Sequence, residues 1–131
     1  MKTAKEIATD IKTFLDGTNL PSEISGVIVC RDRPKNSKKE DVCISVIANE
    51  VGQLQMATIN VNIYVPDVQK DGQFIENEVR TRKLQRLFAD VLERHHCGFY
   101  YFWTDSMTCF GVDGLNEHLI NFKLIYKTVN E

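Results

Sequence analysis

Three side chains in the C-terminal part of the chain supply groups that nucleophilic catalysis can combine. Asp105, Cys109 and His118 provide a carboxylate, a thiol and an imidazole, and Cys97 is a second thiol close by in the sequence. Such groups act together only when the fold brings them into contact. No catalytic signature accompanies them: G-x-S-x-G, the P-loop, G-x-G-x-x-G and H-E-x-x-H are all missing. We therefore predict that the protein is not an enzyme, with a small enzyme using Cys97 or Cys109 as an alternative.

The tripeptide His95-His96-Cys97 places three possible metal ligands next to one another. Adjacent residues of a helix point about 100° apart, so a helical His95 and His96 would not chelate one ion. The i, i+4 histidine spacing of helical zinc sites is missing, and no two of the four cysteines form a C-x-x-C pair. The sequence predicts free thiols, no metal site and no cofactor.

Composition narrows the class of protein. The chain has 131 residues, of which 43% are hydrophobic and 26% are charged, as in an ordinary globular domain. We expect one domain, residues 1–131. Sixteen Lys and Arg against eighteen Asp and Glu leave a net charge of −2, which excludes a uniformly basic nucleic-acid-binding protein. Neither a signal peptide nor an apolar run of about 20 residues is present, so we expect no membrane partner.

The positive charge that the chain does carry is concentrated in one segment. Arg31, Arg33, Lys35, Lys38 and Lys39 fall within nine residues of the polar, turn-rich stretch 31–41, which we call the basic loop. One interpretation is a solvated hairpin tip that keeps the protein soluble. The other is a contact with phosphate groups or with an acidic partner. No aromatic residue is interleaved, so stacking of bases on this loop is not indicated.

An aromatic run at 99–103 puts rings on both faces of a predicted strand. One face belongs in the core, and the other is either covered within the monomer or presented to a ligand or another subunit. Aromatic side chains are enriched at the energetic centres of protein interfaces. The residues that we predict for a subunit interface are Tyr100, Phe102 and Trp103, together with Tyr64.

Periodicity predicts the elements that position these residues. Thr3 and Glu6 form a capping box ahead of an amphipathic helix over 4–15, which Gly17 ends. Strands are predicted at 26–30, 42–48 and 54–65, the last with alternation of apolar and polar residues over most of its length.

The second half of the chain is predicted to contain one helix and two strands. A helix over 74–96 has Asp71 as its N-cap and is closed by Gly98, and strands follow at 99–110 and 118–129. The order α-β-β-β-α-β-β indicates an α+β fold, a two-layer sandwich of a mainly antiparallel sheet with two helices on one face. The long strands would overrun the helices and leave their ends for another subunit.

This arrangement resembles the tail terminator, or tail completion, proteins of long-tailed bacteriophages. The resemblance is carried by the opening helix at 4–15 and the segment ATINVNIYVPD at 57–67. It is also carried by the helix ENEVRTRKLQRLFADVLERH at 76–95 and the closing strand HLINFKLIYKTVN at 118–130. The likeness extends over most of the chain, but the basic loop matches no motif of that family.

The resemblance implies a structural role. Such proteins form a ring, usually a hexamer, that caps the tail tube and joins it to the head connector. The partners would be further copies of the chain, the tail tube and the connector, and the basic loop would meet an acidic neighbour or the passing DNA. The protein would be found in the host cytoplasm during assembly and then in the virion tail. The alternatives are another head–tail joining protein and a small cellular module that binds RNA or a metabolite.

Overall fold

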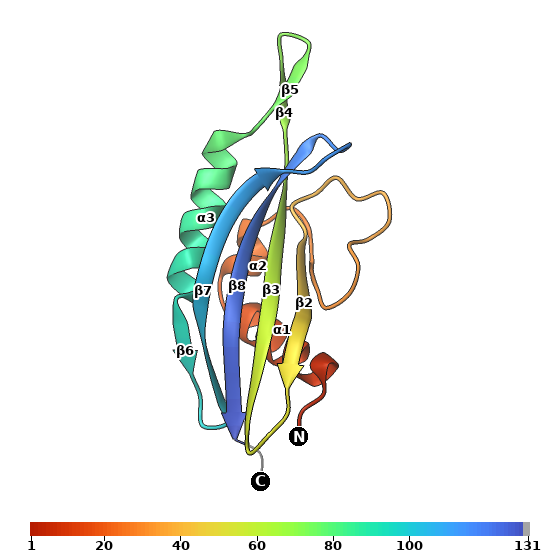
Figure 1. The fold of residues 1–131 in the computed structure, drawn as a ribbon. Coiled ribbons are helices and arrows are strands. Elements are labelled where there is room, and N and C mark those ends of the chain that lie inside the picture. The colour runs from red at the N-terminus through yellow and green to blue at the C-terminus, as the bar shows by residue number, and fades with distance from the viewer. Residues whose placement is uncertain (130–131) are drawn as a thin grey trace.

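Six strands form one curled, mainly antiparallel sheet, and the helices lie on one of its faces in the computed structural model, which describes residues 1–129 (Figure 1). The predicted α+β class is confirmed. The strand order is β1-β2-β3-β8-β7-β6, and β4 pairs with β5 in a separate hairpin. The elements are α1 (Ala4–Asp16), α2 (Leu20–Glu23), β1 (Ile28–Val29), β2 (Val42–Glu50), β3 (Leu54–Pro66), β4 (Val68–Lys70), β5 (Gln73–Ile75), α3 (Glu78–Leu92), β6 (Arg94–His96), β7 (Tyr100–Gly111) and β8 (Glu117–Val129).

The two central strands carry the core. β3 and β8 pair without interruption from Leu54 opposite Val129 to Pro66 opposite Glu117. Alternate residues of β3, from Ala57 to Val65, are buried under the helices, as the alternation of the sequence predicts. The other residues of β3 lie on the face that no helix of residues 1–129 covers. We call this second side of the sheet the open face.

Helix α1 begins where the capping box predicts. The Thr3 amide donates to Glu6 Oε1 at 3.0 Å, and the Glu6 amide donates to Thr3 Oγ1 at 3.2 Å. These two bonds satisfy amides that the first helical turn leaves unpaired. Ile7, Ile11 and Leu15 then face the sheet with no exposed surface.

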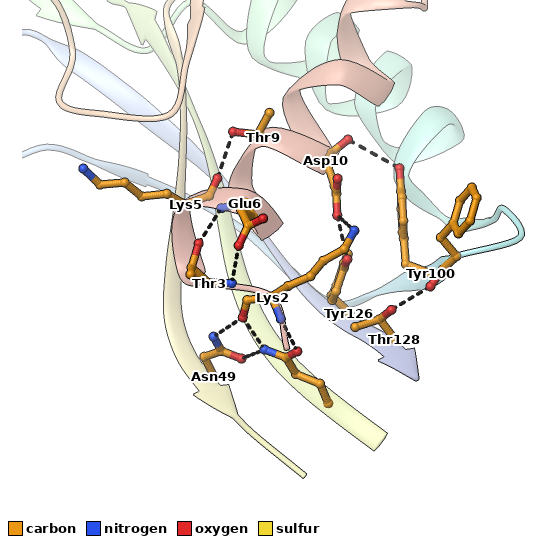
Figure 2. A network of polar contacts seen from close by, with 12 residues as sticks. Lys2, Thr3, Lys5, Glu6, Thr9, Asp10, Asn49, Tyr100, Tyr126 and Thr128 are labelled. Atoms are coloured by element: carbon orange, nitrogen blue, oxygen red, sulfur yellow. Dashed lines mark hydrogen bonds and ion pairs between the residues drawn. The ribbon is translucent and has the colours of Figure 1, made fainter. Parts of the chain in front are cut away.

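A polar cluster fixes the start of α1 to the sheet (Figure 2). Asp10 accepts a hydrogen bond from the Tyr126 hydroxyl at 2.7 Å and forms an ion pair with Lys2. Gln55, which is fully buried, donates to the Lys2 carbonyl at 2.6 Å and accepts from the Lys2 amide at 2.9 Å. Burial and the hydrogen bond with Asp10 together raise the pKa of Tyr126, so this hydroxyl stays a donor.

We expect Tyr126→Phe to destabilise the fold by about 1.5–3 kcal/mol, because the variant loses a buried hydrogen bond to a charged group. Urea unfolding followed by circular dichroism measures the difference. Tyr101→Phe is the matched control, since Tyr101 lies on the open face, and we expect it to change stability by less than about 0.5 kcal/mol. Equal stability of the two variants would contradict a role for the cluster in holding α1.

Helix α3 is shorter than predicted at both ends. Asp71 is not its N-cap: Asp71 and Gly72 have φ values of 52° and 75° and form the turn between β4 and β5. This is the Asp-Gly signal of a tight hairpin, which the helical spacing of the surrounding apolar residues concealed. The N-cap is Asn77, whose side chain accepts from the Arg80 amide.

At its C-terminal end, α3 stops at Leu92, and Gly98 therefore does not close it. The predicted end of the helix forms β6, in which His95 pairs with Phe102 of β7. The His95 ring packs 4.2 Å from the ring of Phe14, centroid to centroid. This packing against α1 favours the strand over a further helical turn.

The basic loop is not a hairpin tip. It joins β1 to β2, and these strands are parallel, with Ile28 opposite Val42 and Val29 opposite Cys43. A parallel pair requires the chain to cross over before it re-enters the sheet, and residues 30–41 make that crossing. The loop is therefore anchored at both ends beside one edge of the sheet.

Candidate functional site

Arg33 is the one of the five basic side chains of the loop that turns inward. Its Nε lies 2.8 Å from Asp41 Oδ2, its Nη1 lies 2.6 Å from the Glu117 carboxylate, and its Nη2 donates to the Lys39 carbonyl at 2.7 Å. The guanidinium also lies 4.3 Å from the centre of the Tyr64 ring. The Arg33 side chain is 13% exposed and is bound within the chain, whereas the sequence alone groups it with the exposed cations that would contact a partner.

Hydrogen bonds keep Arg33 and Asp41 ionised. Burial opposes the charge of Arg33, but hydrogen bonds with Glu117 and Asp41 outweigh it and raise the pKa of the guanidinium. Burial likewise acts to raise the pKa of Asp41, but hydrogen bonds from Ser37, Arg33 and the Val27 amide lower it overall. The three charges are therefore structural, and they fix the basic loop against β8.

Gly26 makes room for this cluster. A Cβ atom at this position would lie 2.2 Å from Asp41 Oδ1 and 2.6 Å from the Glu40 carbonyl oxygen. Only glycine permits so close an approach between the β1 and β2 segments. Glu40 itself is held by Arg80 of α3, with a guanidinium–carboxylate distance of 2.7 Å.

The lowered pKa of Asp41 predicts how the stability of the fold depends on pH. A carboxyl whose pKa is lowered by folding stabilises the native state above its ordinary pKa of 3.8, and this contribution is lost as the pH falls through that range. The stability advantage of wild type over Asp41→Asn should therefore be largest near pH 7 and should shrink below pH 4. Urea unfolding at several pH values measures it, with Asp113→Asn as an exposed control. A constant difference across this range would contradict the assignment.

The remaining cations of the basic loop point to solvent. Arg31, Lys35, Lys38 and Lys39 are exposed, and they stay the predicted contacts for a partner or for DNA. A surface hollow lies between this loop and the β4–β5 hairpin. It is lined by Lys35 and Lys38 from the loop, by Pro66 and Phe74 beside and within the hairpin, and by Leu115 of the β7–β8 turn.

The aromatic strand divides its rings between the two faces of the sheet. Tyr100 and Phe102 point toward the helices: Tyr100 stacks on Tyr126 at 5.1 Å, and Phe102 is 1% exposed and packs on Phe14 at 5.3 Å. Strand alternation therefore places both predicted interface residues on the core side, with Phe102 buried and Tyr100 partly buried.

Trp103 and Tyr64 lie on the open face. Trp103 stacks beside Tyr101 at 5.9 Å, and the Lys127 ammonium lies 5.4 Å from the Trp103 ring centre. Tyr64 lies beneath Arg33 of the basic loop, which covers part of its ring. Of the four predicted interface residues, Trp103 is therefore the one that lies on the open face and is not covered by the basic loop.

The β4–β5 hairpin, residues 68–75, extends beyond the end of the sheet as a narrow arm (Figure 1). Its apolar side chains are exposed: Val68 by 40%, Phe74 by 50% and Ile75 by 41%. The base of the arm is held by His118, whose Nδ1 lies 2.7 Å from Asp67 Oδ1. The arm was not predicted, although its Asp-Gly turn was a visible signal.

The candidate catalytic groups are only partly brought together. Cys109 Sγ lies 3.8 Å from Glu76 Oε1, and His118 Nε2 lies 3.6 Å from the same carboxylate oxygen, whereas Asp105 is exposed elsewhere on β7. Burial and Glu76 raise the pKa of Cys109, which keeps the thiol protonated and weakly nucleophilic. Within residues 1–129, no group of three or more His, Cys, Asp or Glu side chains is placed to hold a metal ion.

Comparison of the chain with protein-family models gives no match, and comparison with curated proteins gives no significant match either. The family resemblance therefore stays a prediction, and function must be argued from the surfaces described above. No helix within residues 1–129 is long and apolar enough to cross a membrane. The features that the fold alone does not explain are the arm, the open face and the exposed cations of the basic loop.

Proposed function

We propose that the chain is a ring-forming structural subunit of a phage or prophage head–tail junction, of the kind that tail terminators represent. In this role several copies close into a ring on the end of the tail tube, and the ring joins the tube to the head connector. Assembly would take place in the host cytoplasm, and the ring would then remain in the virion tail. Another head–tail joining protein of similar size is the nearest alternative.

The observation that carries this proposal is the arm. Its two strands are three residues long, and an isolated two-stranded hairpin of this size is at best marginally stable in water. Val68, Phe74 and Ile75 remain exposed on it, at a distance from the core. An arm of this kind gains its stability from a partner, because the partner buries the apolar side chains that the monomer leaves in water.

The position of the arm and the charge of the basic loop also support an assembly role. The arm lies at one end of the molecule, so it would bind to a surface of the next copy that is not its own arm. Contacts of this head-to-tail kind form a closed ring when the rotation from one copy to the next closes. The basic loop carries four exposed cations beside the arm. These suit an acidic neighbour at the junction or the phosphates of passing DNA.

The test of this function is capping of tail tubes. The purified protein, added to polymerising tail-tube protein encoded beside its own gene, should stop tube growth and be seen at one end of each tube by electron microscopy. Tubes that grow to the same length with and without the protein, and that carry no extra density at either end, would overturn the proposal.

One observation favours a second candidate, a module that binds single-stranded nucleic acid. Tyr101 and Trp103 are neighbouring rings on the open face, and Lys127 lies over one of them. Aromatic rings flanked by cations form stacking platforms for bases. Salt-sensitive binding of single-stranded RNA that Trp103→Ala abolishes would favour this function over the structural one.

A further inference from the structure

We propose that the arm of one copy adds as an extra strand to the free outer edge of β7 in the next copy. This inference rests on the proposed function, since it names the contact that would close the ring. The two elements belong to one chain, but the arm projects beyond the end of the sheet, whereas the free edge runs along its side (Figure 1). The contact therefore joins two copies.

The outer edge of β7 is only half covered. β6 pairs with Tyr101, Phe102 and Trp103, and the Thr104 amide donates to the Glu93 carbonyl at 3.1 Å. Beyond Thr104, no strand of residues 1–129 lies on this side of β7. An edge of this kind presents a row of unpaired backbone groups that another strand can use.

This edge lacks the features that usually block strand addition. Residues 106–111 contain no proline and no charged side chain, and both Met107 and Phe110 are exposed, by 44% and 48%. The β-bulge of β7 lies between Thr104 and Ser106, ahead of this stretch, so 106–111 continue as regular strand. The edge is therefore open over about six residues.

The opposite edge of the sheet is better protected, which explains why β7 is the receiving strand. There the bulge of β2 lies between Val46 and Ala48, in the middle of the part that β1 leaves uncovered. A bulge interrupts the regular spacing of backbone donors and acceptors. The bulge of β7 lies at the start of its free stretch, whereas the bulge of β2 divides the free stretch in two.

Charge complementarity identifies the arm as the occupant. Lys70 is the only charged residue in β4 and β5, and Asp105 is the only charged residue in β7. Asp105 is the extra residue of the β7 bulge, at the start of the free edge. If β4 pairs antiparallel to β7 with Lys70 beside Asp105, Val68 falls opposite Met107 in the regular stretch. This register joins two opposite charges and brings together two exposed apolar side chains. Main-chain bonds would supply affinity, as in other complexes formed by strand addition.

Exchange of these two charges tests the contact. Lys70→Glu places Glu opposite Asp105, and Asp105→Lys places Lys opposite Lys70, so each variant alone should weaken self-association by about tenfold per contact. An equal mixture should recover wild-type assembly, because every contact between unlike copies then pairs opposite charges. Lys5→Glu on α1, with the same change in net charge as Lys70→Glu, should assemble normally.

Sedimentation velocity of the single variants, the mixture and the control separates the outcomes. Loss of assembly in both single variants with recovery on mixing is the expected result. A wild-type oligomer that neither variant weakens, or weakened variants that mixing does not rescue, would overturn the strand contact and leave the ring proposal intact. A wild-type protein that stays monomeric at every concentration, in solution and on tail tubes, would overturn both.

Discussion

A variant without the arm should be a folded monomer that no longer assembles. In this variant a short Asn-Gly turn replaces residues 68–75 and joins Asp67 to Glu76, which is feasible because Val68 and Ile75 are paired neighbours. The core should remain, because the buried residues of the sheet and helices lie outside the arm. We expect stability to change by less than about 1 kcal/mol, whereas self-association should be lost completely.

Light scattering measures the assembly of this variant, and thermal unfolding checks that it is folded. The matched control is Asp71→Asn, which keeps a turn residue that tolerates positive φ and should leave assembly unchanged. If the armless variant forms the same oligomer as wild type, the arm is not an assembly element. The proposed function would then lose the observation on which it depends.

Replacing Arg33 with alanine should destabilise the fold by about 3–5 kcal/mol, because it leaves Asp41 and Glu117 buried without their cation. The side chains of these carboxylates are 2% and 7% exposed, so water cannot replace the guanidinium without rearrangement of the loop. Urea unfolding at pH 7 measures the loss. Lys38→Ala in the same loop is exposed and should change stability by less than about 0.5 kcal/mol.

The size of the Arg33 effect separates the two interpretations of the basic loop. A loss of less than about 1 kcal/mol would mean that Arg33 is a surface cation after all. In a second variant, Arg33→Met is combined with Glu117→Met, which removes one charge of each sign. This variant should recover part of the stability, because a buried ion pair can be replaced by apolar side chains of similar size at small cost.

Local signals made much of the fold predictable. The capping box at Thr3 and Glu6 marked the start of α1, and the alternation along β3 predicted which of its faces is buried. Both patterns depend on neighbours within a few residues, which is the range over which sequence periodicity is informative. The α+β class followed from the order of such elements.

Contacts between distant residues made the rest unpredictable. Arg33 and Glu117 are 84 positions apart, and no local pattern relates them, so a buried ion-pair residue was interpreted as a surface cation. A hairpin tip is one of the two interpretations that the sequence allows for the basic loop, because parallel pairing of β1 and β2 depends on a crossing that leaves no periodic signal. Phe102 was predicted at an interface although its alternation with Trp103 places the two on opposite faces.

The arm shows where two local signals compete. Apolar residues at 74, 75 and 79 fit a helical spacing, while Asp71-Gly72 fits a tight turn. The turn prevails, because both residues adopt positive φ and the flanking strands pair in register. The helical interpretation hid the element on which the proposed function now depends.

The central claim is that copies of this chain close into a ring, and the molar mass of the wild-type protein tests it most directly. Light scattering coupled to size exclusion should give one species at a fixed multiple of 15.0 kDa, about 90 kDa for six copies, over a range of concentrations. A mass of 15.0 kDa at every concentration, or a mass that rises without limit as in an open filament, would contradict the claim.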